Sequence, residues 1–114
     1  MVGYSRAVRV GNVVEVAGTT AQDGDLVTGE GDSYAQTRRA LEKIGEALAA
    51  AWASFADVVR TRIFVTDIAQ WEAVGRAHGE VFGHIRPVST MVQVAALIDP
   101  RLLVEIEATA IIMA

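Results

Sequence analysis

Residues 103–112 read LVEIEATAII, a stretch in which apolar residues at the even positions alternate with mostly polar residues at the odd positions. A period of two places successive side chains on opposite faces of a β-strand. One face would carry Val104, Ile106, Ala108, Ala110 and Ile112, and the other Glu105, Glu107, Thr109 and Ile111. The first set suits packing under helices, and the second describes a face that is only partly covered. This stretch therefore predicts a sheet with its helices on one side.

The rest of the chain supplies four more strands and two helices. Strand-like runs stand at Ala7–Val10, Val13–Gly18, Val58–Val65 and Ser89–Val94, and helical patterns begin near Ser33 and Asp67. Gly11 and Asn12 are typical of a tight hairpin turn. The order β-β-α-β-α-β-β predicts one α+β domain over residues 1–114. We expect a mixed sheet in which hairpins pair neighbouring strands, the last two included, and both helices cover one face.

Helical and strand periods predict the faces of these other elements. The expected sets are Leu41, Ile44, Leu48 and Ala51 in the first helix, Trp71, Val74, His78 and Val81/Phe82 in the second, and Val59, Thr61, Ile63 and Val65 on the strand between them. On the opposite face of the sheet, Phe64, Met91 and Ile111 would mix with charged residues. A mixed face of this kind indicates a partly buried surface between subunits.

Composition narrows the classes of function. The chain has 114 residues, of which 52% are hydrophobic, enough for a core. It has no cysteine, which excludes disulfides and thiolate nucleophiles. A net charge of −4 and a single lysine, Lys43, argue against a nucleic-acid partner. The sequence shows neither a secretory signal nor a membrane-length apolar stretch, so we expect a cytoplasmic protein without a membrane partner.

Glu105 and Glu107 are the first candidates for chemistry. They lie two residues apart on one strand, so both side chains point the same way. Like charges at this distance raise at least one pKa where water is excluded, which prepares a general acid or base. The alternative is structural: both glutamates pair with Arg60 and Arg62 or face solvent. The sequence leaves both interpretations open.

Histidines and hydroxyls give weaker indications. His78 falls on the stripe of the second helix, which favours a hydrogen-bonded packing role. His84 is not spaced to share a helical face with it and no third ligand is evident, so we expect no metal. Ser89 and Thr19 have no histidine placed by sequence to activate them.

Several segments, in the same order, resemble the RidA/YjgF family over nearly the whole chain. They are YSRAV (4–8), VGN (10–12), AG (17–18), AQTRRAL (35–41), DVVRT (57–61), FVTD (64–67), RPVSTMVQV (86–94) and LVEIEA (103–108). The resemblance implies a chorismate-mutase-like fold and a homotrimer with small-molecule sites in its intersubunit clefts. Known members hydrolyse enamines and imines such as 2-aminoacrylate to 2-keto acids and ammonia, without a metal or organic cofactor.

The family's site residues carry over only in part. Tyr4 and Gly18 match residues that line the family's cleft, and Glu107 is matched to the last-strand acidic residue that positions water. Where active members hold the substrate carboxylate with an arginine, this chain has Ser89. Two further positions differ from the family: Thr19 stands where glutamine is common, and Gly75 stands where members with the activity usually have asparagine. The resulting hypothesis has Glu107 as the catalytic residue and Tyr4, Gly18, Thr19, Ser89 and Met91 as substrate-binding residues.

Two functions remain open on this basis. The first is hydrolytic, deaminase-type chemistry on an imine, enamine or related metabolite other than 2-aminoacrylate, whose turnover we expect to be weak or absent. The second is a non-catalytic trimer that binds a metabolite. A ribonuclease is disfavoured because the chain is acidic and lacks a basic or aromatic binding face. The role of Glu105, and whether Arg86 replaces the missing arginine, are left open.

Overall fold

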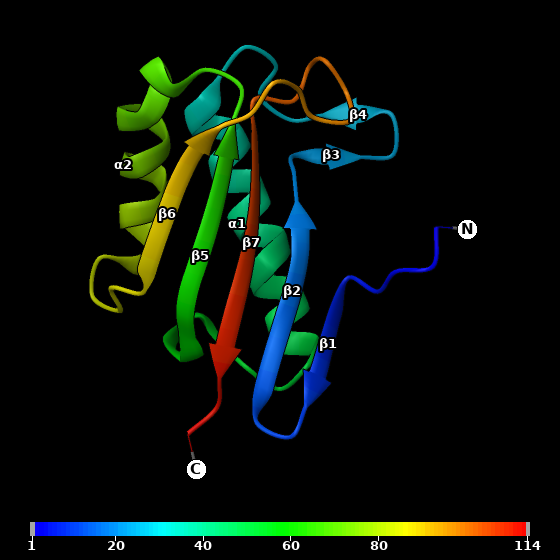
Figure 1. Ribbon diagram of the computed structural model, residues 1–114, viewed down its shortest axis with the longest axis vertical. Coiled ribbons are helices and arrows are strands. Elements are labelled where there is room, and N and C mark those ends of the chain that lie inside the picture. Colours follow the sequence, from blue (N-terminus) through cyan, green and yellow to red (C-terminus); the bar gives the residue numbers. More distant parts are fainter. Residues whose placement is uncertain (1, 114) are drawn as a thin grey trace.

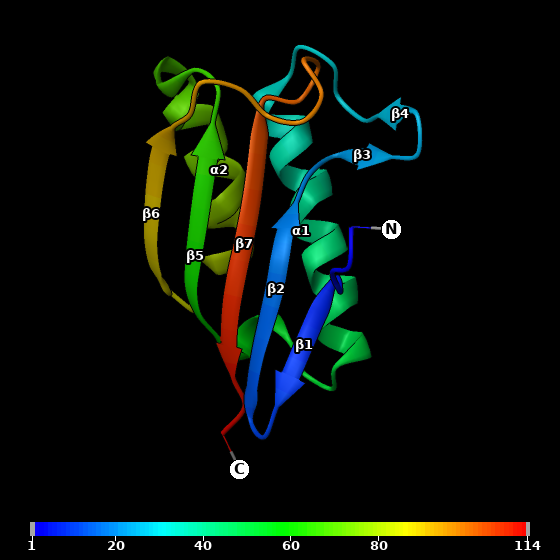
Figure 2. The same ribbon diagram turned by 45° about the vertical axis from the view of Figure 1, so that its right-hand side comes forward.

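A five-stranded sheet carries two helices on one face and leaves its other face open (Figures 1 and 2). The computed structural model describes residues 2–113. Its elements are β1 (Ala7–Val10), β2 (Val13–Thr19), β3 (Gln22–Asp23), β4 (Leu26–Val27), α1 (Ser33–Ala50), a 3-10 turn (Phe55–Asp57), β5 (Val58–Val65), a second 3-10 turn (Ile68–Gln70), α2 (Trp71–Phe82), β6 (Val88–Gln93) and β7 (Val104–Ile111). The predicted α+β class and the shared face of the two helices are confirmed.

The strand order is β1-β2-β7-β5-β6. β7 runs antiparallel to both β2 and β5, whereas β6 runs parallel to β5. The prediction that the last two strands form a hairpin was therefore wrong, because β5 lies between them. The crossover through α2 makes β6 the parallel neighbour of β5, as such connections do. β7 then takes the central place, where both of its edges are paired.

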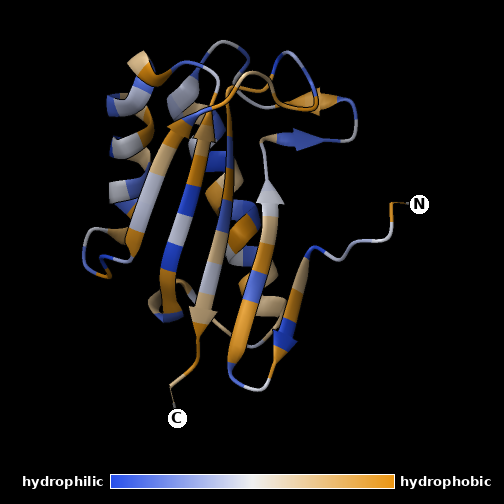
Figure 3. Cartoon of the chain, viewed as in Figure 1, coloured by the Kyte–Doolittle hydropathy of each residue, from blue (hydrophilic) through white to orange (hydrophobic). Residues whose placement is uncertain are grey.

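The core lies between the sheet and the helices, as the alternation on β7 predicts. Val104, Ile106 and Ala110 of β7 are completely buried. Across from them, α1 buries Leu41, Ile44 and Leu48. The sheet face away from the helices is called the open face below. Hydrophilic residues interrupt the hydrophobic ones along β2 and β5 (Figure 3).

Two residues of the sheet lie on other faces than predicted. Val59 is 40% exposed because β5 has an extra residue there: Val58 pairs with Ala110 while Arg60 pairs with Thr109. This β-bulge gives the buried place to Val58. Met91 pairs with Ile63 and packs against the core, so it does not mix with the charges of the open face.

In α2, the expected stripe holds except at its first residue. Val74, Ala77 and Phe82 are buried, but Trp71 is 56% exposed. Within residues 2–113, no helix combines the length and the apolar character that crossing a membrane would require.

Gln36 of α1 fixes the loop that leads into β7. Its side chain is completely buried and donates hydrogen bonds to the carbonyls of Gly29 (3.2 Å) and Arg101 (2.9 Å). Its Oε1 accepts a hydrogen bond from the backbone N–H of Leu103 at 2.8 Å. A buried amide with these partners is fully satisfied. The start of β7, and with it Glu105, is thereby held in place.

Candidate functional site

A pocket of about 530 Å³ lies between the N-terminal segment, β2 and β7. This is within the size range of small-molecule sites. We call it the Glu105 pocket; its lining includes Tyr4, Arg6, Gly18, Thr19, Lys43 and Glu105. Three residues expected from the sequence, Tyr4, Gly18 and Thr19, are thus brought together. Their acidic neighbour is Glu105 and not Glu107.

Glu105 owes its position to Gly18. A Cβ atom on Gly18 would lie 2.8 Å from Glu105 Oε2, closer than real Cβ contacts. β2 has one more residue than β7 between Val16 and Thr19, and Gly18 lies in this irregular stretch. The glycine therefore lets the carboxyl group lie directly on the backbone of β2.

The electrostatic setting of Glu105 favours its neutral form. Burial is the main cause that raises the pKa of its carboxyl group, and the charge of Glu107 raises it further. A half-buried carboxyl group with a raised pKa can donate a proton as an acid and take it back as a base. This is the behaviour expected of a functional carboxyl group.

Two cations line the same pocket, but they differ in their hydrogen bonds. Lys43 Nζ donates to the carbonyls of Thr20 (2.9 Å) and Gln22 (2.7 Å) and lies 3.6 Å from a carboxylate oxygen of Asp23. Burial lowers the pKa of Lys43. Lys43 is therefore engaged in holding β3, whereas the exposed Arg6 is the guanidinium available to a ligand.

Thr19 and Tyr4 line the Glu105 pocket in different ways. The side chain of Thr19 is 2% exposed, and its hydroxyl donates to the carbonyl of Ala17 at 2.8 Å. Thr19 would therefore form part of the pocket wall, and its hydroxyl would not donate to a ligand. Tyr4 is 71% exposed, so its ring and phenol can reach a ligand.

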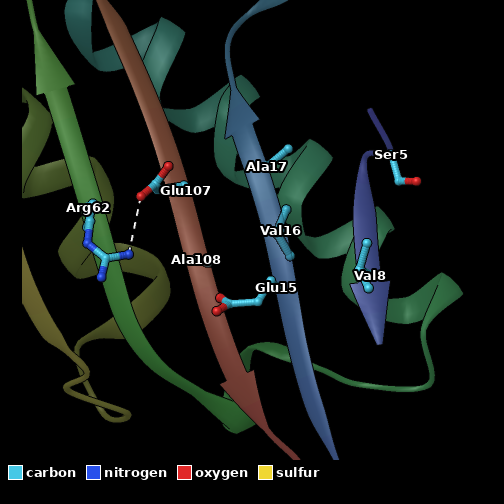
Figure 4. Close-up of a pocket in the computed structure, with 8 residues that line it drawn as sticks. All are labelled: Ser5, Val8, Glu15, Val16, Ala17, Arg62, Glu107 and Ala108. Atoms are coloured by element: carbon cyan, nitrogen blue, oxygen red, sulfur yellow. Dashed lines mark hydrogen bonds and ion pairs between the residues drawn. The ribbon is translucent and has the colours of Figure 1, made fainter. Parts of the chain in front are cut away.

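Glu107 lies in a second pocket, of about 330 Å³, on the open face. Its carboxylate is 3.2 Å from Arg62 Nη1 on the neighbouring β5, and the two side chains point toward each other (Figure 4). Glu15 and Val8 line the same hollow. The ion pair that the sequence left as an alternative is thus present for Glu107, apart from Tyr4, Gly18 and Thr19.

Ser89 and Met91 lie on the other face of the sheet, toward the helices. Ser89 pairs with Thr61 of β5, and the Thr61 hydroxyl donates to Ser89 Oγ at 2.8 Å. The same Thr61 oxygen is 2.9 Å from Nε2 of His78 on α2. The sequence showed no histidine near Ser89, because residues 61, 78 and 89 meet only through the pairing of β5, β6 and α2.

His78 has the packing role that its place on the helical stripe predicts. Its ring lies 4.7 Å from the ring of Phe82, centre to centre, and it is hydrogen-bonded to Thr61. Burial lowers the pKa of His78, so the neutral ring is favoured. Among the described residues, no three histidine, aspartate or glutamate side chains are grouped so as to hold a metal ion.

Comparison with known proteins identifies relatives along the whole chain. The family model described as endoribonuclease L-PSP matches residues 1–112. A crystal structure of Rv2704 from Mycobacterium tuberculosis, a member of the YjgF/YER057c/UK114 family, shares 58% identity at a TM-score of 0.89, covering 97% of this chain and 88% of that one.

Two sequence relatives cover the chain to a similar extent. A Streptomyces coelicolor protein is 45% identical over 108 residues, which are 95% of this chain and 81% of the relative. The 3-aminoacrylate deaminase RutC of Acinetobacter baylyi is 37% identical over 108 residues, 94% of this chain and 85% of the relative. With its two helices on a mixed, chorismate-mutase-like sheet, the chain belongs to the RidA/YjgF family.

Proposed function

We propose that this protein is a hydrolytic deaminase-type enzyme, which acts on an imine or enamine metabolite in the Glu105 pocket. The observation that carries the proposal is the half-buried Glu105 carboxyl group with a raised pKa, seated against Gly18 in a pocket of ligand size. A relative of similar length named 3-aminoacrylate deaminase supports the reaction class.

Hydrolysis of an imine needs one group that both gives and takes a proton. Water adds to the carbon of the C=N bond while the nitrogen is protonated, and the resulting carbinolamine then expels ammonia to leave a carbonyl group. Glu105 in its neutral form can protonate the nitrogen, and its carboxylate can then accept a proton from the attacking water. The raised pKa of Glu105 makes its neutral form more populated at any given pH than that of a glutamate in water.

Glu107 takes a supporting place in this proposal. Its charge is the second cause of the raised pKa of Glu105, and its own carboxylate is paired with Arg62. The role that the sequence comparison gave to Glu107, positioning the water itself, is the competing assignment. The two assignments are separated by the first experiment of the Discussion.

The preferred substrate should lack a carboxylate that must be clamped by two parallel hydrogen bonds. Ser89 stands where active relatives have arginine, and its hydroxyl is engaged with Thr61. A charge-assisted hydrogen bond contributes roughly 1.5–3 kcal/mol. Losing two of them would slow the turnover of 2-aminoacrylate by about two orders of magnitude or more.

The proposal is tested by generating imines in situ from a panel of amino acids with an amino-acid oxidase. Their decay is followed with and without the protein, and 2-aminoacrylate from a dehydratase reaction is included as the reference. We expect acceleration of at least one imine and little acceleration of 2-aminoacrylate. If no imine decays faster, while binding is seen by calorimetry, the protein is the non-catalytic metabolite binder. If 2-aminoacrylate is the best substrate, the interpretation of Ser89 is wrong.

We further propose that the protein is a homotrimer whose subunits meet through their open faces. In support, Val88 and Val92 of β6 pair with Arg60 and Phe64 and are 57% and 42% exposed, so apolar side chains extend onto that face. Sedimentation equilibrium should return three times the chain mass of 12.2 kDa. A monomer at micromolar concentration would refute the trimer.

A further inference from the structure

A chain of three hydrogen-bonding side chains ends at an exposed serine on the edge of the sheet. β6 pairs only with β5 and forms one edge, with α2 beside it (Figure 1). Ser89 is exposed on β6 and is hydrogen-bonded to the completely buried Thr61. Thr61 is in turn hydrogen-bonded to the half-buried His78. These three side chains lie outside the Glu105 pocket, and the family resemblance gives Ser89 only the place of a missing arginine, with no role for Thr61 or His78.

The three side chains Ser89, Thr61 and His78 are connected as a proton relay would be. In the structure the Thr61 hydroxyl donates to Ser89. A hydroxyl group rotates and both donates and accepts, so the two hydroxyls can also turn so that Ser89 donates to Thr61 while Thr61 donates to His78 Nε2. The distances, 2.8 and 2.9 Å, suit both bonds. In this arrangement the other ring nitrogen of His78 carries the hydrogen, and Nε2 offers a lone pair.

The environment of His78 favours the form that accepts a proton. Burial lowers the pKa of the ring, which is packed against Phe82, so the neutral form is favoured. A serine connected to a neutral imidazole is the arrangement that activates a hydroxyl nucleophile. Here the connection passes through Thr61 instead of being direct.

We propose that Ser89 is a nucleophile toward small acyl esters, with Thr61 and His78 as the relay that accepts its proton. Ser89 Oγ forms a bond to the carbonyl carbon of the ester. Its proton passes to Thr61 Oγ1 as the Thr61 proton passes to His78 Nε2. The adduct then expels the alcohol oxygen, which takes the proton back through the relay, and the acyl group stays on Ser89. Water releases it by the same steps, so the net reaction is ester hydrolysis.

In this proposal the donors for the developing oxyanion are backbone N–H groups at the free edge of β6. A strand with one neighbour directs alternate backbone N–H groups away from the sheet, where they have no strand partner. Such N–H groups can donate to the oxygen of a tetrahedral adduct. Met91, which lies on the same face of β6 two residues on, is apolar, which favours an uncharged acyl group.

The test uses para-nitrophenyl acetate with the full-length protein. Released nitrophenolate is followed by absorbance, and the acid-quenched protein is fragmented in a mass spectrometer to locate the acetyl group. We expect one acetyl group on Ser89 and none there after denaturation before reaction. Ser89→Ala should abolish the acylation.

Variants of the relay separate its proton transfer from a structural role. Thr61→Val keeps the shape of the side chain and should slow acylation about 100-fold, the usual size of general-base assistance. Thr61→Ser restores the hydroxyl and should return the rate to within about tenfold of the original. Thr90→Val removes a neighbouring hydroxyl that faces the other side of the sheet beside Arg62, and should change nothing.

Each outcome decides the proposal. An acetyl group on Lys43 or Tyr4 in place of Ser89, or a Thr61→Val protein that reacts as fast as the original, overturns it. Should Thr61→Val fail to fold in a thermal-unfolding control, His78→Gln takes its place, since glutamine keeps a hydrogen bond to Thr61 but accepts no proton. A fast His78→Gln protein would refute the relay equally.

Discussion

Replacing Glu105 with glutamine is expected to lower the turnover of the best imine by at least about 100-fold. Glutamine has nearly the same shape, so the contact with Gly18 and the pocket wall are kept. What is lost is the ionisable proton that burial makes available on Glu105. The measurement is the same imine-decay assay, with the rate at saturating imine compared with that of the unchanged protein.

The matched control is the same substitution two residues away. Glu107→Gln removes a carboxylate from the same strand face, but one that is paired with Arg62 and lies in the other pocket. We expect a smaller loss, within about tenfold, because Glu107 acts on Glu105 only through its charge. If Glu107→Gln is the variant that loses turnover while Glu105→Gln keeps it, the assignment made from sequence is right.

A second variant changes the position of Glu105 but keeps its carboxyl group. In Gly18→Ala the new methyl group would lie 2.8 Å from Glu105 Oε2, which is too close for the two atoms to pack, so the carboxyl group must move. Because that carboxyl group is the end of a flexible side chain, the fold should survive while turnover falls. Gly75→Ala on α2 is the control: a Cβ there meets no atom within 4 Å, and alanine favours a helix over glycine by roughly 1 kcal/mol.

The largest effect on stability is expected for Phe82→Ala. The Phe82 side chain is 2% exposed and packs perpendicular to the ring of Phe55, with the ring centres 5.4 Å apart at 90°. Removing a buried phenylalanine costs about 3–5 kcal/mol in the free energy of unfolding. That is a large part of the 5–15 kcal/mol typical of a whole domain. Denaturant unfolding at a fixed protein concentration measures it, since subunit association also stabilises the folded chain.

Trp71→Ala on the same helix is the control for Phe82→Ala. Trp71 is the larger side chain, but it is 56% exposed at the first residue of α2. We expect it to lower the free energy of unfolding by less than about 1 kcal/mol. Equal losses in the two variants would mean that Trp71 is covered in the protein in solution, as an intersubunit contact would do.

The sequence by itself determined the elements and the faces of the central strand. Alternation along residues 103–112 placed Val104 and Ile106 toward the helices and both glutamates away from them, as observed. Helical spacing likewise identified Leu41, Ile44 and Leu48. These features depend on local periods, which each element carries in its own residues. The buried face of a strand or helix can therefore be predicted without knowing which elements lie next to it.

Tertiary structure decided everything that depends on which strands are adjacent and in what register. Glu105 and Glu107 have the same parity, so alternation cannot tell them apart. The extra residue of β2 near Gly18 brings Glu105 to the pocket of Tyr4, while β5 brings Arg62 to Glu107. Similarly, residues 61, 78 and 89 lie far apart in sequence and meet only because β6 pairs with β5 under α2. Periodicity assigns a side chain to a face, but only the pairing of strands gives it a partner.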